Sequence, residues 1–388
     1  MIDSFRKICI LSDDFPTKDR QVFIFVEQLV IALADFGLNI SVIAPQSITR
    51  SIVRRIPLMQ LREDVITTKG NHFTVYRPYS FSAGNNRLVS SLFSFYNNKR
   101  IDNILRKVKP DILYGHFWHS ANKLKDYALE TNKPLFVACG EGDDALENLV
   151  DSLKDSEKSK LVKAVKGVIS VSSENKRKSI SLSLCKDNDI IVLPNCVDVD
   201  TFHPMKSDSL KKQLGITEED FTIAFTGAFI KRKGCKKLAE AIDKLNDDNI
   251  KVIFIGKGLD GDDCTPNCKG IVHIGPVNHD LIPQYLNASD VFALPTLKEG
   301  CSNAIVEALA CGLPIISSNR SFNDDILNEN NSIRIDPENV DSIADAIYNL
   351  KNDKNLYQRL KTYCSFHSSN YSIDMRAKNI VEFIKTKL

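Results

Sequence analysis

The sequence has no long hydrophobic run. Although 43% of its 388 residues are hydrophobic, no stretch reaches the roughly 18 consecutive apolar residues of a membrane-spanning helix. The opening segment MIDSFRKICILSDDF also lacks a small-residue cleavage site and carries charge on both sides of a short apolar stretch. We therefore expect a cytoplasmic protein without a secretion signal.

Patterns typical of disulfides and metal sites are also missing. The ten cysteines are scattered singly, and several, such as Cys9 and Cys311, lie in apolar runs where a reduced thiol packs as a small hydrophobic group. Cys264, Cys268 and His273 match no standard zinc spacing, and a fourth ligand is missing. We expect neither disulfides nor a bound metal.

Glycine is absent from the segment that follows the first predicted strand. No glycine lies between Ser12 and Phe36, where a dinucleotide-binding domain would carry G-x-G-x-x-G. This absence argues against a dinucleotide oxidoreductase, and it makes a backbone phosphate cradle on this side doubtful.

Net charge is only +2, which argues against a general nucleic-acid binder. The charge is nevertheless uneven, because residues 45–110 hold twelve Lys or Arg against three acids. Within this segment SITRSIVRRIPLMQL mixes apolar residues with arginines, as interfacial segments do. Residues 45–110 are either a solvated face or a docking surface for an anionic membrane or a lipid-diphosphate acceptor. The second alternative would place the protein on the inner face of the membrane.

Short runs rich in Val, Ile, Phe and Tyr alternate with helical stretches along the whole chain, at the spacing of βα crossovers. The runs in the first half are residues 7–12, 39–45, 73–78, 111–117, 134–140 and 167–172. Those in the second half are residues 222–229, 251–258, 270–277, 290–296 and 314–318. The pattern predicts an α/β fold with parallel sheets.

A Pro- and Asn-bearing segment, LPNCVDVDTFHP, interrupts the alternation and is typical of a hinge. We predict two Rossmann-like doubly wound domains that face each other across a cleft. The first spans residues 1–195 and the second residues 196–365. Residues 366–388 form a terminal helix that crosses back to the first domain.

The stretch KEGCSNAIVEALACGLP follows the strand-like VFALPT. Ser302 or Asn303 can cap a helix there, and the free N–H groups of its first turn form a site for a phosphate or diphosphate. Glu299 precedes the helix and Glu307 lies about one turn into it. Carboxylates accept hydrogen bonds from vicinal hydroxyls, so two of them beside a diphosphate site suit a ligand with hydroxyls at both ends and a diphosphate between them. A nucleotide sugar is such a ligand.

These residues also carry a family resemblance. Glu299, seven residues, Glu307, an apolar run and Gly312-Leu313-Pro314 resemble the signature of the retaining glycosyltransferases of family 4, which have the GT-B architecture. The resemblance implies that Glu307 binds the donor ribose and that Glu299 holds hydroxyls of the transferred sugar. The backbone of Gly300, Cys301, Ser302 and Asn303 would cradle the diphosphate and sugar. Alternatively, Glu299 only caps the helix and Glu307 is solvated.

A second loop, GAFIKRKG from Gly227 to Gly234, is similar to the family's G-R-L-x-x-x-K-G loop. Lys233 matches its diphosphate-binding lysine. The family arginine is replaced by Ala228, so we expect Arg232 to supply the missing guanidinium. The alternative is a solvated basic loop.

Three further donor-side or interdomain positions follow from the resemblance. Gly275 and Val277 lie where the family packs the nucleotide base, and Asn195 lies at the interdomain face.

In the first domain, His116 follows a strand and resembles the last histidine of the family's D-x-x-H-x-H, which contacts the donor sugar. A buried structural histidine is the alternative. Gly140, Glu141 and Asp143 follow the next strand, and the resemblance places the acceptor or sugar side there.

The resemblance implies a retaining, metal-independent glycosyltransferase. It would move a sugar from a UDP- or GDP-sugar to a glycan or lipid-linked acceptor, in cell-surface polysaccharide assembly. The family's cationic loop and helix N-terminus take the place of a metal. Two alternatives are a nucleotide-sugar epimerase or hydrolase of the same fold and a non-catalytic two-domain binding protein.

Overall fold

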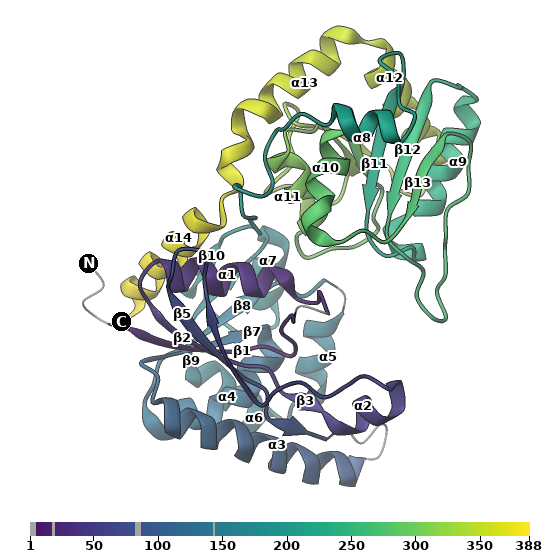
Figure 1. The fold of residues 1–388 in the computed structure, drawn as a ribbon. Helices are drawn as coiled ribbons and strands as arrows, with labels where there is room; N and C mark the ends of the chain where they lie inside the picture. Colours follow the sequence, from purple (N-terminus) through teal and green to yellow (C-terminus); the bar gives the residue numbers. More distant parts are fainter. Residues whose placement is uncertain (1–4, 18–19, 82–86, 143) are drawn as a thin grey trace. The chain divides into compact units, whose positions relative to one another are not determined.

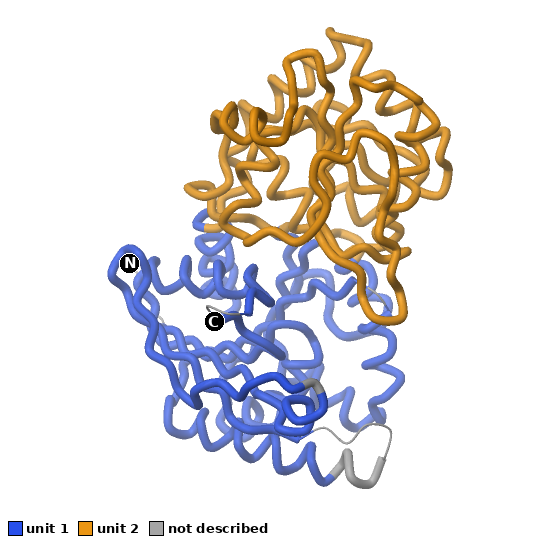
Figure 2. Tube along the Cα trace, turned by 45° about the vertical axis from the view of Figure 1, so that its right-hand side comes forward, with its two compact units in different colours: residues 1–171, 175–193, 374–388 blue, residues 172–174, 194–373 orange. Residues whose placement is uncertain are grey.

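A computed structural model describes residues 5–17, 20–81, 87–142 and 144–388, without the side chains of residues 54 and 87–91. The chain forms two compact units, coloured separately in Figure 2. Unit 1 holds residues 1–171, 175–193 and 374–388, and unit 2 holds residues 172–174 and 194–373. The structure thus divides the chain after residues 193 and 373, where the sequence analysis placed boundaries after 195 and 365.

Unit 1 contains an eight-stranded sheet with the order β10-β9-β8-β7-β1-β2-β5-β4 and a small sheet of β3 and β6. Its strands are β1 (Lys7–Leu11), β2 (Asn39–Ile43), β3 (Gln46–Ser47), β4 (Arg62–Ile66), β5 (His72–Tyr76), β6 (Tyr79–Ser80), β7 (Ile112–His116), β8 (Leu135–Cys139), β9 (Val165–Ser170) and β10 (Ile190–Val192). Its helices are α1 (Ile24–Asp35), α2 (Ile48–Arg54), α3 (Arg87–Val108), α4 (Trp118–Thr131), α5 (Ala145–Ser152), α6 (Asp155–Ala164), α7 (Ser173–Ser181) and α14 (Ile373–Lys387), with a short 3-10 turn η1 (Asp187–Asp189).

Helices cover both faces of this sheet, with α1 and α14 on one side and α3, α4 and α6 on the other (Figure 1). Successive side chains of a strand point to opposite faces of the sheet, so each strand contributes to both layers. On the face under α3 and α4, Cys9 and Leu11 pack with Leu124 in the core. The terminal helix α14 packs on β8 through the rings of Phe383 and Phe136, whose centroids are 6.3 Å apart. The chain end therefore completes unit 1.

Unit 2 contains a six-stranded parallel sheet with the order β13-β12-β11-β14-β15-β16. Its strands are β11 (Phe221–Thr226), β12 (Ile250–Ile255), β13 (Ile271–Gly275), β14 (Val291–Leu294), β15 (Ile315–Ser318) and β16 (Ser332–Ile335). Its helices are α8 (Asp208–Gln213), α9 (Cys235–Leu245), α10 (Ile282–Asn287), α11 (Asn303–Ala310), α12 (Val340–Asn352) and α13 (Lys354–His367), with 3-10 turns η2 (Lys231–Lys233), η3 (His279–Leu281), η4 (Ser321–Asn323) and η5 (Ser368–Tyr371).

Counted in chain order, the unit 2 strands follow the arrangement 3-2-1-4-5-6 of the doubly wound nucleotide-binding fold. The direction of winding reverses between β11 and β14, and in unit 1 it reverses between β1 and β7. In open α/β sheets, ligands bind outside the carboxyl ends of the strands at such a reversal. Each unit therefore has one place where a ligand site is expected.

The predicted α/β fold with two doubly wound domains is confirmed, and each apolar run named in the sequence overlaps a strand. One edge strand of unit 1 departs from the predicted parallel arrangement, because β4 pairs antiparallel with β5. Exposed and half-buried residues alternate along β4, so the strand lacks the continuous apolar run that marks the central strands. Among the described helices, none is both long and apolar enough to cross a bilayer.

Gly115 in β7 allows α4 to approach the sheet, because a Cβ at this position would lie 2.5 Å from the backbone nitrogen of Ala121. We expect Gly115→Ala to destabilise unit 1 by about 1–3 kcal/mol. The new methyl group would meet backbone atoms of α4, which cannot move aside as a flexible side chain can. Urea unfolding followed by the fluorescence of Trp118, the chain's single tryptophan and fully buried in unit 1, measures the change.

Gly70→Ala is the control, since no atom lies within 4 Å of a Cβ there. Its left-handed φ of +83° costs alanine about 1–2 kcal/mol of backbone strain, so this variant measures strain without a steric contact. A Gly115→Ala variant as stable as the wild type would show that the close approach of α4 is not rigid.

Candidate functional site

Two loops of unit 2 lie at the carboxyl ends of β11 and β14, on either side of the reversal in winding. The first runs from Gly227 to Gly234, and the second runs from Pro295 to Ser302 and leads into α11. These are the two stretches that the sequence analysis proposed as phosphate-binding elements. The backbone ties them together, because the amide of Leu297 donates to the carbonyl of Arg232 at 2.8 Å.

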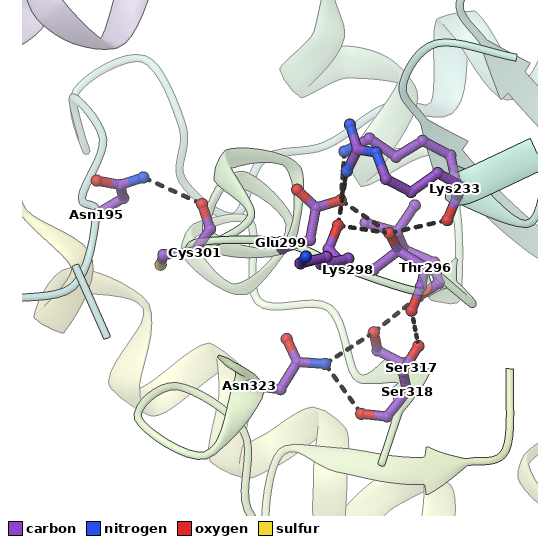
Figure 3. A network of polar contacts seen from close by, with 11 residues as sticks. Asn195, Lys233, Thr296, Lys298, Glu299, Cys301, Ser317, Ser318 and Asn323 are labelled. Carbon is purple, nitrogen blue, oxygen red and sulfur yellow. Dashed lines mark hydrogen bonds and ion pairs between the residues drawn. The ribbon is translucent and has the colours of Figure 1, made fainter. Parts of the chain in front are cut away.

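An ion pair joins the two loops. Nζ of Lys233 lies 2.6 Å from Oε1 of Glu299, and the two side chains are only 16% and 11% exposed. The hydroxyl of Thr296 also donates to Oε1 of Glu299, at 2.9 Å (Figure 3). Glu299 is thus held by a cation and a buried hydroxyl. This contact differs from the capping alternative, in which Glu299 only caps α11.

Arg232 lies beside the same pair. Its Nη1 donates to the carbonyl of Lys298 at 2.6 Å and lies 3.4 Å from Oε1 of Glu299. Two cationic side chains of η2 therefore converge on the carboxylate of Glu299. The side chains of a solvated basic loop would not share such a partner. Arg232 remains about one-third exposed on its outer side.

Glycine makes the close approach of these loops possible. Gly234 has a left-handed φ of +73°, and a Cβ there would lie 2.1 Å from the carbonyl oxygen of Pro295. Any larger residue would push the two loops apart.

The helix α11 begins at Asn303, with Ser302 at its N-cap position. The sequence analysis expected Ser302 or Asn303 to cap this helix, but Ser302 is buried and its side chain makes no capping hydrogen bond. The side-chain cap is therefore a wrong expectation. The first-turn amides are left to another acceptor, as an anion site at a helix N-terminus requires.

Asn195 fixes the entry to this helix. Its Nδ2 donates to the carbonyl of Cys301 at 3.1 Å (Figure 3). It also donates to Oδ1 of Asn303 at 2.8 Å. Gly300, before Cys301, is buried. Asn195 of unit 2 therefore fixes the backbone of the loop that leads into α11.

Glu307 lies on α11 and is buried, with only 8% of the residue exposed. Its Oε1 is 3.3 Å from Nε2 of His279, whose ring contacts Phe202 with centroids 5.2 Å apart. This burial excludes the alternative in which Glu307 is a solvated helix residue. His279 did not emerge from the sequence, although it lies two residues after Val277.

The residues proposed for the nucleotide base follow β13. Gly275 has a φ of +141° with no atom within 4 Å of a Cβ position, and Val277 packs at the edge of a small apolar cluster. Gly275 also accepts a backbone hydrogen bond from Gly256 at 3.0 Å. Open space over Gly275 is compatible with a flat group, but no contact made by these residues identifies a base.

A buried polar network supports the second loop from below, and the sequence analysis missed it. Asn323 is fully buried and donates from Nδ2 to the carbonyl of Ser318 at 3.0 Å and to the hydroxyl of Ser317 at 3.3 Å. The hydroxyl of Ser318 in turn donates to the carbonyl of Thr296 at 2.5 Å (Figure 3). Serines at a strand end have no spacing signature, so only the structure reveals their role.

In unit 1, His116 ends β7 and is only 5% exposed. Its ring lies between Phe25 and Phe117, with centroids 5.5 Å and 4.7 Å away. Burial and the positive charge of Arg376 lower the pKa of His116 to about 3, against a smaller opposite effect of Asp13. The imidazole is therefore neutral at physiological pH.

Gly140 and Glu141 follow β8, and Asp143 lies outside the described residues. Oε1 of Glu141 accepts a hydrogen bond from the amide of Trp118 at 2.7 Å, which caps α4. Desolvation raises the pKa of Glu141. The structure thus gives Glu141 a local structural contact in addition to the sugar-side role that the sequence analysis expected.

The described part of the chain contains no group of three or more His, Cys, Asp or Glu side chains that could hold a metal ion.

The chain is similar to known glycosyltransferases. Residues 206–364, which contain both loops, match the family Glycosyl transferases group 1. The chain is 25% identical over 341 residues to the putative teichuronic acid biosynthesis glycosyltransferase TuaC of Bacillus subtilis, covering 84% of this chain and 83% of TuaC. It is 33% identical over 179 residues to the Escherichia coli UDP-Gal:alpha-D-GlcNAc-diphosphoundecaprenol alpha-1,3-galactosyltransferase, covering 42% of this chain and 46% of that enzyme.

Solved structures share the whole fold. Sucrose-phosphate synthase from Thermosynechococcus elongatus superposes with a TM-score of 0.74 at 15% identity, covering 98% of both chains. HepE from Anabaena, in complex with UDP-glucose, superposes with a TM-score of 0.71 at 16% identity, covering 98% of this chain and 99% of HepE. At this identity the likeness shows the fold alone.

The two doubly wound units, together with the likeness to these solved structures, define a protein of the GT-B architecture. Residues 206–364 belong to the family Glycosyl transferases group 1, which is family 4 of these enzymes, and the chain is a glycosyltransferase.

The pKa of His116 provides a test of its burial. Since the folded-state pKa of about 3 lies below the unfolded value of about 6.5, protonation favours the unfolded chain. The contribution of His116 to stability is present above pH 6.5 and is lost as pH falls towards 3, by up to about 1.4 kcal/mol per pH unit.

We therefore expect His116→Gln to flatten the fall in unfolding free energy between pH 6.5 and pH 3, measured by urea unfolding with Trp118 fluorescence. The control is His72→Gln at an exposed position of the same unit. Parallel pH curves for the wild type and His116→Gln would contradict the burial of a neutral imidazole.

Proposed function

We propose that the chain is a retaining, metal-independent glycosyltransferase that moves a sugar from a nucleotide-diphosphate sugar to a glycan or lipid-linked acceptor. The observation that carries the proposal is the contact between Lys233 and Glu299, beside the uncapped start of α11. A cation, a carboxylate and free helix amides at one point match a diphosphate attached to a sugar.

The donor-side roles follow from the position of each group. The α11 amides and Lys233 would bind the diphosphate. Glu299, the ion-pair partner of Lys233, would accept hydrogen bonds from hydroxyls of the transferred sugar. Glu307, held by His279 at 3.3 Å, would bind the ribose hydroxyls. Arg232, the neighbour of Lys233, would supply the guanidinium that Ala228 lacks. The guanidinium of Arg232 can bind a phosphate through two parallel hydrogen bonds, and the ammonium of Lys233 acts as a point charge. Together they suit the two phosphates.

Catalysis in this proposal is electrostatic. As the glycosidic bond to the diphosphate breaks, negative charge grows on the departing oxygen, and Lys233, Arg232 and the helix amides stabilise it. The diphosphate oxygen accepts the proton of the attacking acceptor hydroxyl on the same face, so the anomeric configuration is retained. We propose that His116 acts in catalysis as a neutral hydrogen-bonding group, since its pKa of about 3 makes it a poor general acid.

The names of the relatives indicate the class of substrate. One is named a putative teichuronic acid biosynthesis glycosyltransferase, another is named a UDP-Gal:alpha-D-GlcNAc-diphosphoundecaprenol alpha-1,3-galactosyltransferase, and a third is named a capsular polysaccharide biosynthesis glycosyltransferase of Staphylococcus aureus. HepE binds UDP-glucose. We therefore propose a UDP- or GDP-sugar as donor and cell-surface polysaccharide assembly as the process.

An apolar and basic surface of unit 1 favours action at a membrane. Ile52 and Val53 on α2 are 73% and 81% exposed, and Leu92 and Phe95 on α3 are 71% and 73% exposed. Both helices contact β6. A protein surface rarely exposes so many large apolar side chains close together without a partner.

Cations accompany these side chains. Arg50 and Arg55 flank the exposed part of α2, and Lys99 lies one turn beyond Phe95 on α3; all three are exposed. Apolar groups that insert among basic ones are the combination that an anionic bilayer attracts. We propose that this surface docks on anionic lipid, where a lipid-linked acceptor would be found.

The donor site is tested by Lys233→Ala. We expect affinity for UDP or GDP, measured by titration calorimetry, to fall by about tenfold or more, because a charge-assisted hydrogen bond to phosphate contributes about 1.5–3 kcal/mol. Lys231→Ala is the matched control, since Lys231 lies in the same turn but is exposed. Equal losses for the two variants would indicate a solvated basic loop and not a site.

Products decide between transfer and the alternatives. With donor and an acceptor glycan, mass analysis should show the acceptor enlarged by one sugar, with retained anomeric configuration by NMR. An isomerised donor or free sugar as the sole product would identify an epimerase or a hydrolase, and binding without any product would identify a binding protein.

Membrane docking is tested by cosedimentation with phosphatidylglycerol vesicles. Replacing Val53 and Phe95 by serine should weaken binding by more than about tenfold, because burying each side chain contributes about 1.5–3 kcal/mol. Ile66→Ser is the control, since Ile66 is 64% exposed on the edge strand β4. Unchanged binding of the double variant, or equal binding of the wild type to neutral phosphatidylcholine vesicles, would contradict the proposal.

A further inference from the structure

Glu307 uses one of its two carboxylate oxygens within the protein. Oε1 lies 3.3 Å from Nε2 of His279, and the imidazole is 16% exposed and the carboxylate side chain 11%. Within the described residues, Oε2 has no hydrogen-bond partner. Because a carboxylate accepts hydrogen bonds and does not donate them, the hydrogen of this contact lies on Nε2 of the imidazole. His279 therefore holds one oxygen and leaves the other for a ligand.

The imidazole of His279 has a fixed place in unit 2. Its ring meets the fully buried ring of Phe202 edge to face, with centroids 5.2 Å apart and planes at 60°. Backbone hydrogen bonds hold both partners. The amide of Phe202 donates to the carbonyl of Asp198 at 2.8 Å. Within η3, the amide of Leu281 donates to the carbonyl of Asn278 at 2.9 Å. The donor nitrogen is therefore in position before any ligand binds.

The surroundings of Glu307 make such a donor valuable. Its neighbours on α11, Val306 and Ala308, are fully buried. A carboxylate that is largely removed from water is costly unless hydrogen-bond donors compensate the lost hydration. A long side chain also loses rotamer freedom when a ligand orders it, and this loss weakens binding unless the side chain is ordered beforehand. One directional donor on Oε1 meets both needs.

His279 also connects the proposed ribose site with the proposed base site. It lies two residues after Val277 and four residues after Gly275, in the segment that joins β13 to α10. The segment that was proposed to pack the base therefore also carries the side chain that orders Glu307. One loop would thus act on both halves of the nucleoside.

We propose that His279 is the positioning residue of the ribose site. By donating to Oε1 of Glu307, it directs Oε2 at the ribose hydroxyls and so sets the preference for a ribonucleotide over its 2′-deoxy analogue. The inference rests on the proposed binding of the donor ribose by Glu307 and adds the residue that makes this binding selective. His279 acts through Glu307 and does not have to touch the ligand.

The test compares ribonucleotides with deoxyribonucleotides on the full chain. Titration calorimetry with UDP, 2′-deoxy-UDP, GDP and 2′-deoxy-GDP gives the affinity ratio of each pair. The variants are His279→Ala, which removes the donor, and His279→Gln, whose side-chain amide can donate in place of Nε2. His203→Ala is the matched control, because His203 is an exposed histidine of the same unit.

We expect the wild type to bind UDP or GDP about tenfold or more tightly than the 2′-deoxy analogue, because hydrogen bonds to a charged group are among the stronger ones. His279→Ala should lower this ratio to about threefold or less, since a carboxylate that is free to rotate loses much of that contribution. His279→Gln and His203→Ala should keep the ratio of the wild type.

A histidine that only fills space beside Phe202 would give a different result. His279→Ala would then weaken binding of the ribonucleotide and of its deoxy analogue equally, and the unchanged ratio would overturn the proposal. A His279→Gln variant with the same low ratio as His279→Ala would also overturn it, because the donor would then not be what matters.

Glu307→Ala separates this inference from the proposed function. If Glu307→Ala loses the preference for the ribonucleotide and His279→Ala keeps it, Glu307 binds ribose and only the inference about His279 fails. If the wild type shows no preference, or binds neither UDP nor GDP, the proposed ribose or donor site fails, and the inference about His279 is overturned with it.

Discussion

The proposed donor site depends on one ion pair, between Lys233 after β11 and Glu299 after β14. The two strands are neighbours in the sheet, but 66 residues separate the side chains in the chain. Their contact fixes the spacing of two loops that would otherwise be independent. A largely buried pair of this kind contributes little net stability, because desolvation offsets much of the attraction. Its value is that it keeps a cation and a carboxylate ready for a ligand that needs both.

The surroundings of the pair serve the same end. Thr296 is buried and donates to Glu299, and the Asn323 network holds the backbone of Thr296 from below. Gly234 allows the loops to touch. On the other side, Asn195 fixes the loop that enters α11. A preorganised site of this type does not have to reorganise when charge develops on a leaving diphosphate.

The fold was predictable because continuous apolar runs mark buried parallel strands, and the candidate loops were predictable because Glu299, Glu307 and Lys233 have a recognisable spacing. Contacts that depend on tertiary packing were not predictable. His279 meets Glu307 only because η3 packs near α11, and Asn323 carries no signature that separates it from a surface asparagine. The edge strand β4 was missed because its alternation of exposed and half-buried residues lacks the apolar run of a central strand.

The central claim is that Lys233 and Glu299 act as one unit in binding the donor. A double-mutant cycle on the calorimetric affinity for the intact UDP- or GDP-sugar, with Lys233→Ala, Glu299→Gln and both, measures this directly. Residues in contact in one network couple by about 0.5–3 kcal/mol, so the account predicts that the double variant loses clearly less affinity than the sum of the single losses. Strictly additive losses would show that the two side chains act separately and would contradict the account.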